Sequence, residues 1–415
     1  MRDGGRLAAA IEVLEDFVAR RVPLKVTLAD WGRGARYAGS KDRAFVSGLC
    51  LDALRWWESY GGPVSARLPV RHALRGWGWT EERIGLAFAE APHGPGALTG
   101  AEAAHEPTAG FDAPDWLQGA FARLPEGTLE GLCARAPVDL RVNTLRGTTE
   151  RALKATRTIG AQPAPIAADA LRIPAPPAAD RAPAVTVIPA YGRGLVEVQD
   201  EGSQIAALCA GDVAGAQVLD LCAGGGGKTL ALAAMMGNTG QLYAYDADPR
   251  RLAPIHERLR RAGVRNVQVR SPADGGSTDD LEGRMDVVVI DAPCTGTGTW
   301  RRRPDTKWRL TEAQLAARQA EQDAVLAAGA RLVRPGGIVL YVTCSVLREE
   351  NEDRVAALTA PGFEVESAVQ AIDSARLTEG GRRALPAWEE TGVLRLDPAR
   401  AGTDGFTITR LRRSG

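Results

Sequence analysis

Two cysteines stand at the ends of two apolar runs and are the residues of this chain best suited to covalent chemistry. Cys294 follows VVVIDAP, and Cys344 follows GGIVLYVT. Each run is rich in β-branched residues, which predicts a buried parallel strand. Ligands of an open α/β sheet bind beyond the carboxyl ends of its strands. We therefore expect both thiols to face one pocket, where one could attack an electrophilic carbon while the other assists.

A glycine-rich turn upstream predicts a cofactor site. The stretch QVLDLCAGGGGKT (217–229) is typical of a strand, a tight turn and the start of a helix. Glycines let the backbone turn sharply and approach a ligand closely, and a helix N-terminus offers free N–H groups. The next predicted strand, QLYAYD, ends in Asp246. An acidic side chain at that place is suited to bind ribose hydroxyls.

Two other nucleotide-binding motifs resemble this turn, and each fails at one residue. A Walker loop that ends at Thr229 would need glycine at position 222, which is Cys222. A dinucleotide fingerprint that begins at Gly224 would need glycine at position 229. S-adenosylmethionine is also held by a glycine turn and a ribose-binding acid, and it fits methyl transfer to a ring that a thiol has activated.

Several stretches of the chain carry a family resemblance. They are DLRVNTLR (139–146), VEVQDEGSQIAA (196–207), LDLCAGGGGKT (219–229), YAYDADPRRL (243–252), IDAPCTGTGTWRRRPDTKW (290–308), LVRPGGIVLYVTCSVLREENEDRV (332–355) and TDGFTITRLRR (403–413). In this order they resemble the RsmB/Nop2/Sun family of RNA cytosine-5 methyltransferases over roughly residues 110–415. The DAPC and TCS-x4-EN elements are the most specific. Gly225 stands where the family more often has proline or alanine.

The resemblance implies roles for the residues of the site. Cys344 is implied as the nucleophile whose thiolate adds to carbon 6 of cytosine, so that carbon 5 can accept a methyl group. Cys294 is implied in loss of the carbon 5 proton and release of the base, Asp291 in contacts to the cytosine edge, and Asp274 on the adenine side of the cofactor. The residues expected to bind S-adenosylmethionine are Cys222, Ala223, Gly224, Gly225, Gly226, Gly227, Lys228, Asp246, Asp274 and Asp291.

The resemblance also implies the fold class and domain organisation. We expect an α/β protein with a Rossmann-like, S-adenosylmethionine-dependent methyltransferase domain over residues 196–415. An all-α, NusB-like RNA-binding domain with a connecting helix is expected over 1–135, and a small α+β, RNA-recognition-like subdomain over 136–195. Helical periodicity at 5–19, 42–58 and 82–91 agrees with the first of these. In the second, LRIP (171–174), VTVIP (185–189) and LVEVQD (195–200) are predicted to complete a sheet with DLRVN.

One local cluster of charge predicts contact with nucleic acid. The formal net charge of the chain is zero, whereas RNA-binding proteins usually show a basic footprint. The segment WRRRPDTKWR (300–309) holds Arg301, Arg302, Arg303, Lys307 and Arg309 against a single acid, with tryptophans at two positions. Basic side chains neutralise phosphates and aromatic rings stack on bases. This segment is therefore expected to contact RNA, and a solvated charged loop is the alternative.

Composition limits the remaining possibilities. The six cysteines show no C-x-x-C spacing, so neither a zinc site nor a disulfide framework is indicated, and free thiols suit the cytoplasm. No apolar stretch approaches 20 residues, so no membrane span is expected. We expect a cytoplasmic monomer that binds 16S ribosomal RNA and no metal. A tRNA methyltransferase of the same family and a non-catalytic RNA-binding assembly factor are alternatives. In a DNA cytosine methyltransferase, the third alternative, Cys294 would be the nucleophile.

Overall fold

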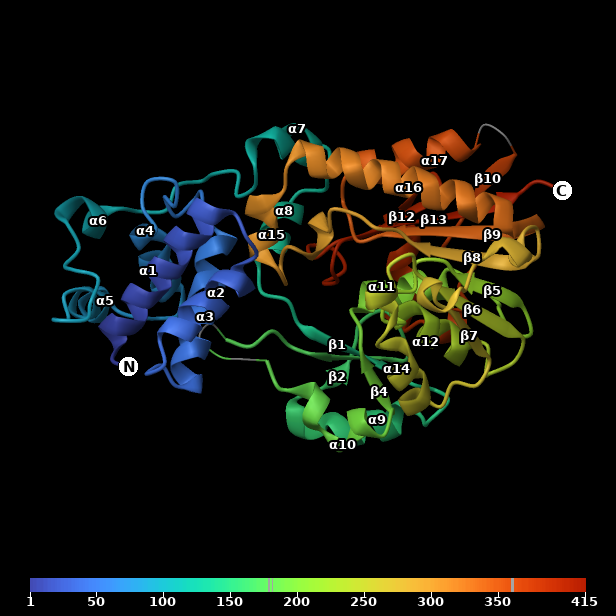
Figure 1. Cartoon of the computed structure of the whole chain (residues 1–415), viewed down its shortest axis with the longest axis horizontal. Coiled ribbons are helices and arrows are strands. Elements are labelled where there is room, and N and C mark those ends of the chain that lie inside the picture. Colours follow the sequence, from blue (N-terminus) through green and yellow to red (C-terminus); the bar gives the residue numbers. More distant parts are fainter. Residues whose placement is uncertain (178–179, 181, 360–361) are drawn as a thin grey trace. The chain divides into compact units, whose positions relative to one another are not determined.

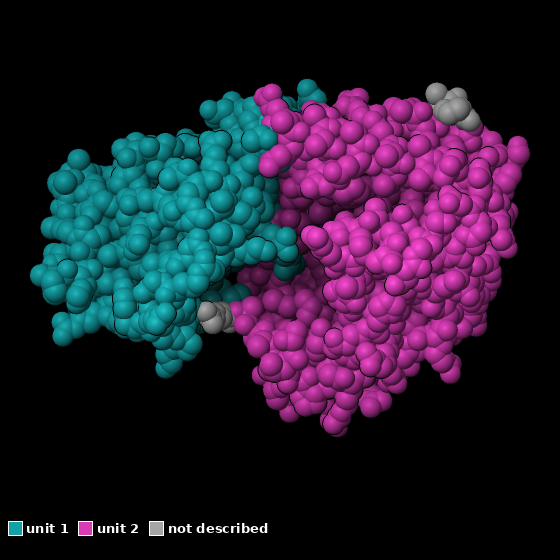
Figure 2. Space-filling view, viewed as in Figure 1, with its two compact units in different colours: residues 1–135, 176–181, 300–311 teal, residues 136–175, 182–299, 312–415 magenta. Residues whose placement is uncertain are grey.

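The computed structural model describes the chain except for residues 178–179, 181 and 360–361. The chain forms two compact units, which are coloured separately in Figure 2. Unit 1 comprises residues 1–135, 176–181 and 300–311, and unit 2 comprises residues 136–175, 182–299 and 312–415. In the described part of the chain, no helix is long and apolar enough to cross a lipid bilayer.

Helices build the described part of unit 1. The longer ones are α1 (Asp3–Arg20), α2 (Leu24–Gly34), α3 (Ser40–Arg55), α4 (Arg67–Gly76) and α5 (Glu81–Phe88). Shorter ones are α6 (Gly100–Ala104), η1 (Asp115–Leu117), α7 (Gln118–Phe121), α8 (Thr128–Cys133) and α15 (Pro304–Arg309). Leu7 and Leu14 lie on one face of α1 and pack into a core with Leu49 of α3 and Ile84 of α5. The helices predicted at 5–19, 42–58 and 82–91 are thus confirmed.

A small antiparallel sheet begins unit 2. Its strands are β1 (Val138–Val142), β2 (Gln162–Pro163), β3 (Ala170–Ile173) and β4 (Val196–Val198), in the order β2-β3-β1-β4. Helices α9 (Thr149–Thr156) and α10 (Pro189–Gly192) accompany it, with the 3-10 turns η2 (Arg157–Ile159) and η3 (Val185–Val187). The strand predicted at VTVIP is wrong, because this stretch forms η3 and then α10. Pro189 occupies the first turn of α10, a position that favours helix.

The large sheet of unit 2 is doubly wound. Its strands are β5 (Gln217–Asp220), β6 (Gln241–Tyr245), β7 (Val267–Arg270), β8 (Met285–Asp291), β9 (Val333–Thr343), β10 (Phe363–Glu366), β11 (Glu389–Glu390), β12 (Val393–Leu396) and β13 (Phe406–Arg413). They run in the order β11-β12-β13-β9-β8-β5-β6-β7, and β10 pairs with β13. Strands β5 to β9 pair in parallel, and β13 is antiparallel to β9. The chain reverses its direction of progress across the sheet between β5 and β8, and ligands bind at such a switch point.

Helices cover both faces of the large sheet (Figure 1). They are α11 (Glu201–Leu208), α12 (Gly227–Met235), α13 (Pro249–Leu252), α14 (Ile255–Ala262), α16 (Glu312–Leu332), α17 (Glu352–Thr359) and α18 (Glu379–Ala384). Neighbouring residues of β5 face opposite cores: Val218 packs with α11 and α12, and Leu219 packs with α16. This alternation explains why the parallel strands are apolar on both sides, and the Rossmann-like α/β fold preceded by a helical region is confirmed.

Candidate active site

The carboxyl ends of the parallel strands bring the predicted site residues to one edge of the sheet. The glycine turn follows β5, Asp246 follows β6, Asp291 ends β8 and Cys344 follows β9. Asp291 lies opposite Val342 in the register of β8 and β9, so the segments that follow these two strands start side by side. The sequence placed these residues at strand ends, and the structure places the strand ends next to each other.

The two thiols are in direct contact. The sulfur atoms of Cys294 and Cys344 lie 3.3 Å apart, and both residues are partly exposed. The pKa of Cys294 lies well above its ordinary value, because it shares a hydrogen bond with Cys344 and because burial disfavours a thiolate. Cys294 is therefore a neutral thiol at neutral pH, and its S–H can be donated to the sulfur of Cys344.

A buried carboxylate fixes the loop that carries Cys294. The Glu350 side chain accepts a hydrogen bond from the backbone N–H of Thr295 at 2.8 Å and another from the Thr295 hydroxyl. Gln322 of α16 donates both to this carboxylate at 3.0 Å and to the carbonyl of Pro293 at 2.9 Å. Glu350 and Gln322 are fully buried. The bond between Gln322 and Glu350 is buried, where loss of one partner leaves a costly unpaired group.

The same loop makes a close backbone contact with the strand β13. The N–H of Gly298 donates to the carbonyl of Cys344 at 3.0 Å, and the N–H of Gly405 donates to the carbonyl of Gly298 at 2.8 Å. A Cβ atom on Gly298 would lie 2.1 Å from the Gly405 oxygen. Only glycine fits at position 298, and this contact holds the Cys294 loop, the Cys344 turn and β13 together.

A buried ion pair orients Asp291. The ammonium of Lys228 lies 2.7 Å from a carboxylate oxygen of Asp291. The Lys228 side chain is only 3% exposed, whereas that of Asp291 is 39% exposed. The same ammonium lies 3.4 Å from the hydroxyl of Ser203 in α11. Lys228 thus holds one side of the Asp291 carboxylate from within the protein, and the other side is open to a ligand.

The glycine turn and Asp246 form one bonded unit. The Asp246 carboxylate is 3% exposed and accepts the N–H groups of Gly224 and Asp248, each at 2.9 Å. Gly224 and Gly226 have φ of +49° and +84°, in the left-handed region that favours glycine. A Cβ on Gly226 would lie 2.6 Å from the side chain of Ile255 in α14. The turn is therefore packed tightly enough that only glycine fits at position 226.

An unpartnered acidic oxygen beside this turn points to a ligand with hydrogen-bond donors. Asp220, at the end of β5, is fully buried; one of its oxygens accepts from the Thr229 hydroxyl at 2.6 Å, and the other has no partner. Burial raises the pKa of Asp220 to about 7. Hydroxyl and ammonium groups of S-adenosylmethionine would supply such donors, so these residues fit the predicted cofactor.

The other predicted cofactor residues differ in exposure. Cys222 and Ala223 are buried, and the Ala223 N–H donates to the carbonyl of Tyr245 at the end of β6. Burial raises the pKa of Cys222, which suits packing better than thiol chemistry. Gly225 and Gly227 complete the turn. Asp274 is exposed in η4 (Pro272–Asp274), which follows β7.

The basic segment that was predicted to contact RNA is partly buried within unit 1. Trp300 is fully buried and stacks on Phe121 with ring centroids 5.3 Å apart. Lys307 is 1% exposed and donates to the carbonyl of Arg55 at 2.8 Å and to the sulfur of Cys133 at 3.2 Å. Arg301 is also buried. The predicted RNA contact is therefore wrong for Trp300, Arg301 and Lys307, because these side chains pack among the helices of unit 1. Arg303 is exposed.

Sequence reasoning missed two residues of the site. Gln322 lies in the long helix α16 outside every motif, and Ser203 reaches Lys228 from α11. The only signal in the sequence would have been a polar residue at a position of α16 that faces the sheet.

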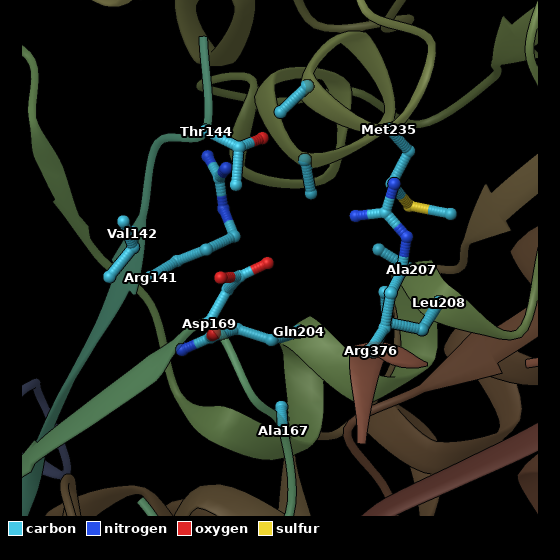
Figure 3. A pocket seen from close by; sticks show the side chains of 12 residues that line it. Arg141, Val142, Thr144, Ala167, Asp169, Gln204, Ala207, Leu208, Met235 and Arg376 are labelled. Carbon is cyan, nitrogen blue, oxygen red and sulfur yellow. The ribbon is translucent and has the colours of Figure 1, made fainter. Parts of the chain in front are cut away.

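A small cavity of about 40 Å³ lies elsewhere in unit 2 (Figure 3). Arg141, Asp169 and Gln204 point into it, and Met235 of α12 forms part of its wall. Its lining includes no predicted site residue. The cavity has room for only a few water molecules, so it is not the substrate site.

Comparison with known proteins agrees with this geometry. Residues 210–412 match the family model for the 16S rRNA methyltransferase RsmB/F. The ribosomal RNA small subunit methyltransferase B of Sodalis glossinidius is 32% identical over 306 residues, which cover 72% of this chain and 65% of that protein. The protein of the same name from Yersinia pseudotuberculosis is 33% identical over 288 residues, which cover 66% of this chain and 61% of that protein. The chain thus spans less than two thirds of these relatives.

Solved structures share the fold. A methyltransferase homologue from Pyrococcus horikoshii superposes with a TM-score of 0.55 and 27% identity, covering 71% of this chain and 93% of its own. The crystal structure of PH0851 superposes with a TM-score of 0.70 at 22% identity, covering 100% of this chain and 99% of that one. At that identity the second likeness shows the fold alone.

The glycine turn, Asp246 and the unpartnered oxygen of Asp220 lie together at the switch point of the sheet. The cofactor of this site is S-adenosylmethionine. The chain belongs to the RsmB/Nop2/Sun family of methyltransferases.

Proposed function

We propose that this protein methylates carbon 5 of a cytosine in RNA, with S-adenosylmethionine as methyl donor and a covalent cysteine–cytosine intermediate. The observation that carries the proposal is the pair of thiols 3.3 Å apart at the ends of β8 and β9. Asp291, which pairs with Lys228, is the last residue of β8 and so lies near this pair of thiols. Nucleophilic catalysis at a ring carbon needs a thiolate, a group that binds the ring edge and a second group that manages protons.

Cys344 acts as the nucleophile. Its thiolate adds to carbon 6, and the electron pair of the C5=C6 bond makes carbon 5 nucleophilic. S-adenosylmethionine supplies an electrophilic methyl group, which carbon 5 takes. The electron pair of the carbon 5–hydrogen bond then re-forms the C5=C6 double bond while the sulfur–carbon 6 bond breaks. Cys294 passes its proton to the departing Cys344 sulfur and takes up the proton that leaves carbon 5, so both cysteines end as thiols. A thiolate, unlike a thiol, is nucleophilic enough for the first step.

Cys294 acts in the second half of the reaction. Its sulfur lies within contact distance of the Cys344 sulfur, and therefore beside the bond that must break. Because its pKa is raised, Cys294 stays protonated and is a poorer nucleophile toward carbon 6 than a thiolate would be. The bonds from Glu350 and Gln322 keep its loop in place during the cycle.

Asp291 binds the edge of the target cytosine. The Asp291 carboxylate is partly exposed and can accept hydrogen bonds from the base, while the buried ammonium of Lys228 pairs with one of its oxygens. Asp246 and the glycine turn hold the ribose side of the cofactor, and Asp274 lies on the adenine side. The proposed steps use no metal ion.

Ribosomal RNA is the proposed substrate. The curated relatives at 31–33% identity carry the name ribosomal RNA small subunit methyltransferase B, and the matching family model describes 16S rRNA methyltransferases. We assign a NusB-like domain to 1–135, an RNA-recognition-like subdomain to 136–195 and the methyltransferase domain to 196–415. We also assign the chain to the cytoplasm, as a monomer. Bisulfite sequencing of total RNA from a deletion strain tests the substrate: loss of a 5-methylcytosine from tRNA instead of 16S rRNA would contradict this part.

The roles of the thiols are tested with two alanine variants and a radiolabelled RNA. Cys344→Ala should lose methyl transfer and every covalent adduct. Cys294→Ala should methylate once and then remain bound, as a slowly migrating protein–RNA band on a denaturing gel. Cys209→Ala, which removes a buried thiol away from the site, is the control and should behave like the unaltered protein. Adducts with Cys344→Ala and none with Cys294→Ala would reverse the roles and support the chemistry of DNA cytosine methyltransferases.

A further inference from the structure

An exposed basic surface of unit 2 lies outside the residues considered so far. It combines one face of α9 with η2, the turn of residues 143–147 and the helix α14. We call it the α9–α14 surface. Its exposed basic side chains are Arg146, Arg151, Lys154, Arg157, Arg260 and Arg265. The exposed acids of these elements are Glu150 and Glu257, so positive charge dominates locally in a chain whose formal net charge is zero.

The basic residues of α9 share one face. Arg151 and Lys154 are three residues apart, as are Lys154 and Arg157, and residues at this spacing are neighbours on a helix. Ala152 and Thr156 of the same helix are buried against the small sheet. The packing of α9 therefore directs the basic side chains to solvent, where each like charge raises the local potential.

Hydrogen bonds through the turn of residues 143–147 join the two helices, which are far apart in the sequence. The Arg146 guanidinium donates to the carbonyls of Arg260 and Arg261 at 3.4 and 3.2 Å, at the C-terminal end of α14. Arg151 of α9 donates to the carbonyl of Arg146 at 3.4 Å. Figure 1 shows α9 and α14 on the same side of unit 2. The basic side chains thus form one continuous surface.

This surface also adjoins the cofactor turn. Arg258 of α14 donates to the carbonyl of Gly225 and pairs with the buried Glu197 at 3.3 Å. Arg261 pairs with the same carboxylate at 2.5 Å and lies over the ring of Tyr191 at 4.1 Å. Glu197 holds these two arginines in place, while the outer charges stay in solvent. A strand bound along α14 would therefore pass beside the glycine turn.

We propose that the α9–α14 surface binds the phosphates of the RNA substrate and guides the strand toward the catalytic edge. The inference rests on the proposed function. Phosphates are the repeating anions of RNA, and a row of exposed arginine and lysine side chains is the footprint that such a polyanion requires. We assign to this surface the role that the sequence had suggested for residues 300–309, of which Trp300, Arg301 and Lys307 are buried in unit 1.

The test compares two quadruple variants of the full chain that remove the same net charge. The surface variant carries Arg151→Gln, Lys154→Gln, Arg157→Gln and Arg260→Gln. The control variant carries Arg284→Gln, Arg318→Gln, Arg331→Gln and Arg383→Gln, which are exposed positions elsewhere in unit 2. Glutamine retains good helix propensity. Binding of a fluorescent RNA with a single-stranded cytosine is measured by anisotropy over a series of salt concentrations, and S-adenosylmethionine binding is measured by calorimetry.

The surface variant should bind RNA more weakly and with a flatter salt dependence. Each lost phosphate contact lowers the slope of log affinity against log salt by about 0.7 for a single strand, so four contacts would lower it by about 3. The control variant should keep the slope of the unaltered protein, and both variants should keep its affinity for S-adenosylmethionine. An equal loss in both variants, or an unchanged slope in the surface variant, would overturn the inference alone. If the unaltered protein bound no RNA, the proposed function would fall with it.

Discussion

Asp246→Asn tests the cofactor site with the smallest change in shape. The carboxylate of Asp246 is nearly inaccessible, accepts two backbone N–H groups at 2.9 Å and lies 3.6 Å from the exposed guanidinium of Arg251. Asparagine keeps the volume and one acceptor oxygen. It removes the negative charge and turns an NH₂ group toward one of the N–H groups. The change should therefore weaken the proposed cofactor contact without opening a cavity.

The expected magnitude follows from the difference between charged and neutral hydrogen bonds. A bond to a charged group contributes about 1.5–3 kcal/mol, and a neutral bond about 0.5–1.5 kcal/mol. Loss of the charge should therefore cost about 1–1.5 kcal/mol, which is about a five- to tenfold rise in Kd. Asp246→Ala removes the acceptors altogether and should cost about 1–3 kcal/mol, or up to about 150-fold in Kd.

Calorimetric titration of the purified protein with S-adenosylmethionine measures this without RNA. Asp248→Asn is the matched control: Asp248 is exposed and caps α13 by accepting the N–H of Arg250 at 2.9 Å. It should bind the cofactor like the unaltered protein. If Asp246→Asn retained full affinity while its unfolding free energy was unchanged, the ribose would have to be held by another acid, for which Asp220 is the nearest candidate.

Other predictions concern stability and substrate access. Asp220→Asn should flatten the pH dependence of the unfolding free energy. The pKa of Asp220 is about 7 in the fold and about 3.9 in the unfolded chain. The protonated carboxyl therefore stabilises the fold fully below about pH 4, and this stabilisation is lost at about 1.4 kcal/mol per pH unit as the pH rises toward 7. Urea unfolding of both proteins at several pH values measures this, and parallel profiles would contradict it. Glu350→Ala should destabilise the protein by about 1–3 kcal/mol, since the N–H of Thr295 and the amide of Gln322 would lose the one oxygen that accepts from both. An unchanged urea midpoint would show that the loop has other support. A cytosine in a loop should be methylated faster than the same cytosine in a stable duplex, because a stacked base must first be flipped out; equal rates on the two RNAs would argue that the protein opens the duplex itself.

Strand ends and their chemistry were accessible from the sequence because they are local. The apolar runs before Asp246, Asp291 and Cys344 predicted β6, β8 and β9, and these strands are confirmed. Parallel strands of one sheet share an orientation, so residues at their carboxyl ends had to share an edge. Strands β10, β11 and β12 were not predicted, since they are only two to four residues long and carry charged residues.

Burial of the basic segment could not be read from the sequence. Lys307 meets Arg55 and Cys133, which lie 252 and 174 residues away along the chain. A run of arginine, lysine and tryptophan has the same composition on an RNA-binding loop and in a helix that packs through its long aliphatic stems. Only the tertiary contacts distinguish the two. The hydrogen bond from Gln322 to Pro293 could not be predicted either, because it too depends on a tertiary contact between distant residues.

The contact between Gly298 and Gly405 has a consequence for the biogenesis of the enzyme. During synthesis, β13 leaves the ribosome after every other strand of the large sheet, yet Gly405 and Thr407 bond to the Cys294 loop and to the carbonyl of Ser345. A nascent chain that has already formed β5 to β9 can pair those strands and still lack Gly405 and β13, which bond to the loop of Cys294 and to the turn of Cys344. Catalytic competence should therefore appear late and abruptly as translation proceeds, and partly made chains would not modify RNA in the cell.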